Sequence, residues 1–143
     1  MGLLNRYEKI RMDKDAIPKA ESRNRSGGKK RMNRTIRVSA AGDILIMKRL
    51  LPGYQDVLPI REFLMQGEVR MANLETTISD GSCYASAYSG GTWLTADAKC
   101  LEDTLRYGFN FLGISNNHTM DYSYEGLAST ISELKKKDVA YAG

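Results

Sequence analysis

Strand-like and helix-like segments alternate three times along the chain, and this alternation limits the possible folds more than any other feature. Short strands are expected where β-branched and small apolar residues run into glycine or polar turn residues, and helices where apolar residues recur every three or four positions. The expected strands cover residues 35–43, 69–74, 109–114 and 139–142, and the expected helices cover 56–66, 97–107 and 122–137. Such alternation predicts an α/β fold in which helices cover a parallel β-sheet.

Each predicted helix is expected to bury one apolar face. Thr95 or Asp97 caps the middle helix, and Gly108 ends it. Four apolar residues of the first helix share one face and are expected to be buried. They are Val57, Ile60, Phe63 and Leu64.

The connection over residues 79–95 is rich in Gly, Ser and Tyr and is expected to be irregular. A connection of this length inside a compact domain is often functional. It contains Cys83, and Cys100 follows 17 positions later. The two cysteines form no CxxC pair and have no histidine nearby, so we expect two partly buried thiols rather than a zinc site.

Charge divides the chain into two parts. Residues 1–37 hold twelve Lys and Arg against four Asp and Glu, whereas residues 38–143 hold nine basic and thirteen acidic side chains. We therefore expect a basic, disordered arm over residues 1–34 and a folded domain over residues 35–143. The alternative for the arm is a tether to an anionic polymer, a nucleic acid or a membrane surface, although it carries no clear nucleic-acid motif.

The sequence shows no membrane or export signal. The longest run without a charged residue, 81–96, is too short and too polar to span a bilayer. The first twelve residues lack the apolar core of a signal peptide. We therefore expect no transmembrane helix and a cytoplasmic location.

Polar side chains follow three of the predicted strands. The groups are Gly42–Asp43, Asn73–Leu74–Glu75 and Asn116–Asn117–His118. Ligands of parallel sheets bind at the carboxyl ends of the strands, and these oxygen and nitrogen donors suit Mn, Fe, Zn or Mg. Each group taken alone is also what a turn or a helix cap contains, so a shared metal site and ordinary capping both stay open.

Three stretches carry a resemblance to a known family. They read AAGDILI over 40–46, ANLETTISDG over 72–81 and GISNNHTMDYSYEGLASTISELKKKDVAYAG over 113–143. In order and spacing they resemble the capsule-synthesis CapA-type proteins, also called the poly-γ-glutamate biosynthesis family, over about residues 36–143. This family belongs with the calcineurin-like metallophosphoesterases, so the resemblance implies a layered sheet and helix sandwich and partners in the capsule-synthesis machinery. It also implies relatives that are often membrane-anchored.

The resemblance implies a role for each polar residue. The implied metal ligands are Asp43, Asn73, Glu75 and Asn117, and the implied catalytic residues are His118 and Asp121. In the superfamily, two divalent cations activate a water and clamp the oxygens of a phosphoester. His118 then stabilises or protonates the phosphoryl group, and Asp121 orients the imidazole.

Two features depart from the family pattern. Asp43 is followed by Ile44 and Leu45, so the Asp-x-His of the superfamily is missing. The resemblance also stops in the middle of the family pattern, before the remaining ligand histidines. We therefore expect an incomplete fragment, weakly active or inactive alone, that self-associates through an exposed sheet edge. The alternative is a non-catalytic binding or assembly module.

Overall fold

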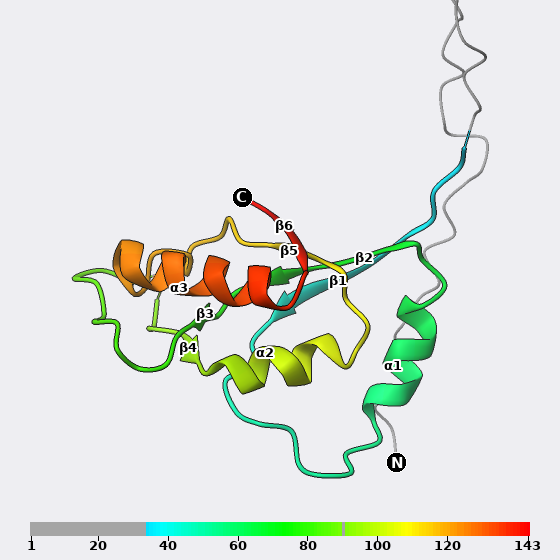
Figure 1. Ribbon diagram of the computed structural model, residues 1–143, viewed down its shortest axis with the longest axis horizontal. Helices are drawn as coiled ribbons and strands as arrows, with labels where there is room; N and C mark the ends of the chain where they lie inside the picture. Colours follow the sequence, from blue (N-terminus) through cyan, green and yellow to red (C-terminus); the bar gives the residue numbers. More distant parts are fainter. Residues whose placement is uncertain (1–33, 90) are drawn as a thin grey trace, which may run out of the picture. The chain divides into compact units, whose positions relative to one another are not determined.

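The computed structural model describes residues 34–89 and 91–143, which form a mixed α/β unit (Figure 1). Its elements are β1 (Val38–Ile44), α1 (Val57–Leu64), β2 (Val69–Leu74), β3 (Thr77–Ile78), β4 (Thr95–Ala96), α2 (Ala98–Leu105), β5 (Phe111–Gly113), α3 (Ser123–Lys136) and β6 (Ala140–Ala142). The predicted basic arm lies outside the described residues except for Arg34. Its guanidinium pairs with Glu68 at 2.6 Å.

The main sheet has the order β1-β2-β5-β6, and every neighbouring pair in it is parallel. A helix connects each strand to the next one in this order, as the alternation in the sequence predicted. The predicted α/β fold with a parallel sheet is therefore confirmed. All four strands end at the same edge of the sheet, so the residues that follow them are brought together.

One irregularity in β1 positions the first polar residue. Ala40 pairs with Met71, but Asp43 pairs with Asn73, so β1 uses one more residue than β2 over this stretch. This is a β-bulge. Because partners in register face the same side of a sheet, the bulge places the Asp43 side chain on the same face as Asn73.

The hydrophobic core lies on one face of the sheet. Leu74 and Leu112 of the sheet pack in one cluster with Leu101 of α2 and Leu134 of α3, and all four are at most 4% exposed. Within the described residues the opposite face is open, and Met71 is exposed there. The longest described helix, α3, has 14 residues, and no helix in the described ranges is both long and apolar enough to cross a bilayer.

Only part of the predicted apolar face of helix α1 is buried. Val57 and Leu64 are buried as expected, but Ile60 is 48% exposed and Phe63 is 60% exposed. The two buried residues lie seven positions apart, on one narrow line of the helix. The spacing identified the apolar residues of the helix correctly, but it did not indicate how narrow the contact is.

The connection over residues 79–95 is more ordered at its ends than predicted. Thr77–Ile78 and Thr95–Ala96 form a second, two-stranded parallel sheet that joins both ends of the connection. Thr130 of α3 fixes this sheet, because its hydroxyl accepts a hydrogen bond from Ile78 N at 2.9 Å. Both cysteines are free: Cys83 is partly buried and Cys100 is buried.

Candidate functional site

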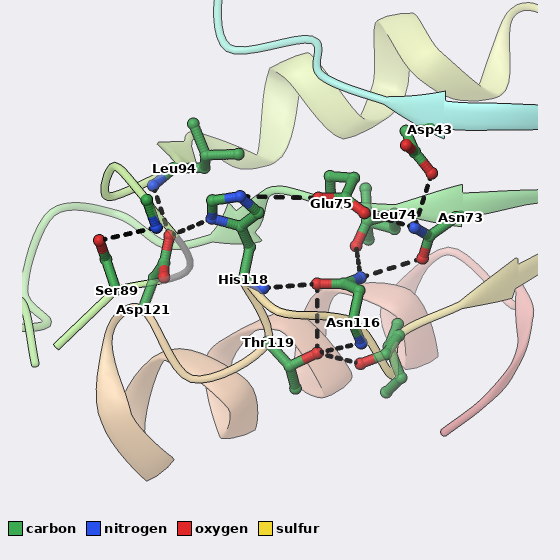
Figure 2. A network of polar contacts seen from close by, with 12 residues as sticks. Asp43, Asn73, Leu74, Glu75, Ser89, Leu94, Asn116, His118, Thr119 and Asp121 are labelled. Carbon is green, nitrogen blue, oxygen red and sulfur yellow. Dashed lines mark hydrogen bonds and ion pairs between the residues drawn. The ribbon is translucent and has the colours of Figure 1, made fainter.

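The carboxyl ends of β1, β2 and β5 bring polar side chains together, and these side chains are called the polar row below (Figure 2). Asp43 comes from β1, Asn73 and Glu75 from the end of β2, and His118 and Asp121 from the turn before α3. Five of the six predicted site residues therefore belong to one continuous network of hydrogen bonds and ion pairs. The sixth, Asn117, is exposed in the turn and also takes part in a polar or electrostatic interaction.

One amide group joins the two carboxylates nearest the sheet. Asn73 Nδ2 donates to Asp43 Oδ1 at 2.8 Å and to Glu75 Oε1 at 2.5 Å. Glu75 is 8% exposed, whereas Asp43 is open to solvent. Two carboxylates converge on one donor, so this point attracts positive charge.

His118 lies between two carboxylates. Its Nδ1 is 2.8 Å from Asp121 Oδ2, and its Nε2 is 3.7 Å from Glu75 Oε2. Asp121 is 1% exposed, and its Oδ2 also accepts a hydrogen bond from Leu94 N at 2.8 Å. A carboxylate on Nδ1 holds the proton on that nitrogen, so Nε2 is the nitrogen that is left to exchange a proton.

Asn116 connects this pair to β2. The sequence places it in the polar group that contains His118 but indicates no separate role for it. Its Nδ2 donates to Asn73 Oδ1 at 3.0 Å and to the carbonyl oxygen of Leu74 at 2.9 Å. Its Oδ1 accepts a hydrogen bond from His118 N at 2.9 Å. A side-chain bond to the amide two residues later is an Asx turn, which an Asn two positions before the histidine could have indicated.

The loop between β3 and β4 is fastened to the same place. Ser86 N donates to the carbonyl oxygen of Asp121 at 2.8 Å, and Trp93 Nε1 donates to the carbonyl oxygen of Ser86 at 3.0 Å. Together with the bond from Leu94 N, these contacts cover Asp121 with backbone. The loop therefore shields the carboxylate that orients His118.

The side chains of the polar row suit Mg²⁺ better than Zn²⁺. Within residues 34–89 and 91–143, no group of three or more His, Cys, Asp and Glu is arranged to hold a metal ion. A closed zinc site, which uses four nitrogen or sulfur ligands, does not fit. Asp43 and Glu75 do fit the way Mg²⁺ is held, by one or two carboxylates together with water.

Comparison with known proteins gives a family match. A family model described as "Bacterial capsule synthesis protein PGA_cap" matches residues 29–143. The chain is also similar to two uncharacterized proteins of Sinorhizobium fredii, y4sH and y4uA. Each is 29% identical to it over 111 residues, which cover 73% of this chain and 23% of the relative. The chain therefore spans about a quarter of the length of these relatives.

Proposed function

The chain belongs to the PGA_cap family of bacterial capsule synthesis proteins, and from this premise we propose that its polar row is a metal-dependent hydrolase site. In this site Asp43 and Glu75 hold a divalent cation, and His118 acts as the acid and base. Phosphoesters are the substrate class, because the CapA-type resemblance implies phosphoester chemistry.

The convergence of two carboxylates on one donor supports the proposal most strongly. Asp43 Oδ1 and Glu75 Oε1 both lie within hydrogen-bond distance of Asn73 Nδ2. Mg²⁺ or Mn²⁺ fits these ligands, with water completing the coordination. A divalent cation held there would lower the pKa of a coordinated water and withdraw charge from a phosphoryl oxygen.

His118 has the environment of a proton carrier. Its bond to Asp121 fixes the ring and directs Nε2 toward the side of Glu75. In the protonated form Nε2 donates to a leaving oxygen, and in the neutral form it accepts a proton from water. Asp121 positions the ring through its bond to Nδ1.

Cation binding can be tested on the full chain by calorimetric titration with Mg²⁺ and with Mn²⁺. The double variant Asp43→Asn, Glu75→Gln should weaken binding at least about tenfold, because it removes both charged ligands. Glu62→Gln is the matched control, since this carboxylate is exposed on α1. Equal affinity in all three proteins would show that the cation does not bind between Asp43 and Glu75.

Hydrolysis can be tested with p-nitrophenyl phosphate and the same cations. His118→Gln should lower the rate by about 10²-fold or more, which is the usual contribution of a general acid or base. Turnover that is unchanged in this variant would refute the role of His118.

A second function is favoured by the lack of a third charged or imidazole ligand in the described residues. In that case the site is a non-catalytic binding module of the capsule-synthesis machinery, in which a cation bridges the protein to an anionic polymer. Cation binding without any turnover would support this function and refute the hydrolase.

A further inference from the structure

A cavity of about 370 Å³ lies away from the polar row, beside Ser79 and Asp80 after β3 and beside the first turn of α2. Ser79 follows β3, Asp97 follows β4, and Ser129 and Ser132 of α3 line the cavity from the other side. None of the six predicted site residues lines it. Its volume falls in the range of about 300–1,000 Å³ that is usual for small-molecule sites.

The position of the cavity follows the rule that identified the polar row. Ligands of parallel strands bind beyond the carboxyl ends, and β3 and β4 are parallel. The residues that lead out of both strands, Ser79 and Asp97, line the cavity. At the amino end of β4, Leu94 binds Asp121 of the polar row. The two-stranded sheet of β3 and β4 therefore separates the polar row from the cavity.

Two side chains offer hydrogen-bonding groups to a ligand. Ser79 is 5% exposed, and its hydroxyl oxygen accepts from Gly81 N at 3.1 Å, while its hydrogen finds no acceptor within the described residues. Asp97 Oδ1 accepts from Lys99 N at 2.7 Å and from Cys100 N at 3.3 Å. Its Oδ2 forms no hydrogen bond in the described part of the chain. One buried donor and one acceptor are thus available.

The charges of the lining disfavour an ionic ligand. Lys136 is paired with Glu133 at 2.6 Å, and Asp97 already occupies the amides at the start of α2. An anion would therefore meet carboxylates, and a cation would meet Lys99 and Lys136. A neutral ligand with many hydroxyl groups avoids both kinds of charge repulsion. Each of its hydroxyl groups can donate and accept a hydrogen bond.

We propose that this cavity binds a neutral saccharide unit through Ser79, Asp97 and the serines of α3. Apart from Ala98, all the residues that line it are polar, so the hydroxyl groups of a saccharide find hydrogen-bond partners there. The proposal does not depend on the hydrolase, because the two sites share no residue.

Nuclear magnetic resonance of the ¹⁵N-labelled full chain tests the proposal. The probes are D-glucose, D-galactose and N-acetyl-D-glucosamine, each added to about 100 mM, well above the millimolar Kd of a weak complex. At least one probe should shift the amide signals of Gly81, Ser82 and Lys99 in a saturable way. The amide signals of His118 and Asp121 should shift less.

A variant that fills the cavity distinguishes binding there from binding elsewhere. Ser132→Tyr places a large side chain at an exposed lining position and should weaken saccharide binding at least about tenfold. Ala128→Tyr is the matched control on α3, exposed and outside the lining, and should leave binding unchanged.

Three results would overturn the proposal. The first is the absence of saturable shifts with all three saccharides. The second is equal binding in the Ser132→Tyr and Ala128→Tyr variants. The third is saturation only with inorganic phosphate or L-glutamate, because then the cavity takes an ionic ligand.

Discussion

Asn116→Ala should destabilise the domain, because this side chain joins β2 to the turn that carries His118. The change removes four side-chain hydrogen bonds: two donated by Nδ2, to Asn73 Oδ1 and the Leu74 carbonyl, and two accepted by Oδ1, from His118 N and Thr119 Oγ1. A typical intramolecular hydrogen bond contributes about 0.5–1.5 kcal/mol net. The site is only partly buried, so water replaces some of these bonds, and we expect a loss of about 2 kcal/mol.

Urea unfolding of the full chain, followed by far-ultraviolet circular dichroism, measures this loss. For a domain of this size 2 kcal/mol corresponds to a decrease in Tm of roughly 8 °C. Asn116→Asp should cost at least as much, since a carboxylate cannot donate to the Leu74 carbonyl. Ser115→Ala is the control, because Ser115 is exposed beside Asn116 and should change stability by less than about 0.5 kcal/mol. A free energy of unfolding for Asn116→Ala within about 0.5 kcal/mol of the wild type would refute the reasoning.

Three further changes test the core and its charges by the same unfolding measurement. Leu101→Ala removes a fully buried side chain and should cost about 2.7–5 kcal/mol; a loss below about 1 kcal/mol would mean that Leu101 is not in the core. Gly126→Ala would place a methyl group 2.5 Å from Tyr122 Cβ and should cost about 1–3 kcal/mol, so an unchanged urea midpoint would contradict this close packing. The hydrogen bond from Arg49 lowers the pKa of Asp103, so this carboxylate stabilises the fold above its unfolded pKa of about 3.9 and stops doing so as the pH falls through its lower folded value. Asp103→Asn should therefore lose less stability than the wild type between about pH 5 and pH 3, and parallel pH profiles would count against the ion pair.

The main sheet was predictable from the sequence because its connections are short and its strands are bounded by clear turn residues. The second sheet was not, because Thr77–Ile78 and Thr95–Ala96 are too short to show any period. The wrong prediction for Ile60 and Phe63 has a different cause. Helical spacing shows which residues share a face, whereas the area that the neighbouring elements cover depends on tertiary packing.

The candidate site was predictable in position more than in detail. The carboxyl ends of parallel strands meet at one edge, so Asp43, Asn73 and Glu75 were expected to lie together. The contacts of Asn116 were not accessible, because the sequence does not show which of two adjacent asparagines closes a turn. In the structure, Asn116 accepts a hydrogen bond from the amide of His118 and donates one to the Leu74 carbonyl.

The bulge in β1 makes chain length at residues 41–42 as important as residue identity. If the pairing of Ala40 with Met71 continued regularly without the bulge, Asp43 would come opposite Leu74 on the core face. An insertion of one residue beside Gly42, with the bulge still absorbing a single extra residue, would have the same effect. It would leave every polar side chain of the site in the sequence and still remove one carboxylate from it. An alignment of relatives that tolerates gaps at this point would therefore overlook the loss of the site.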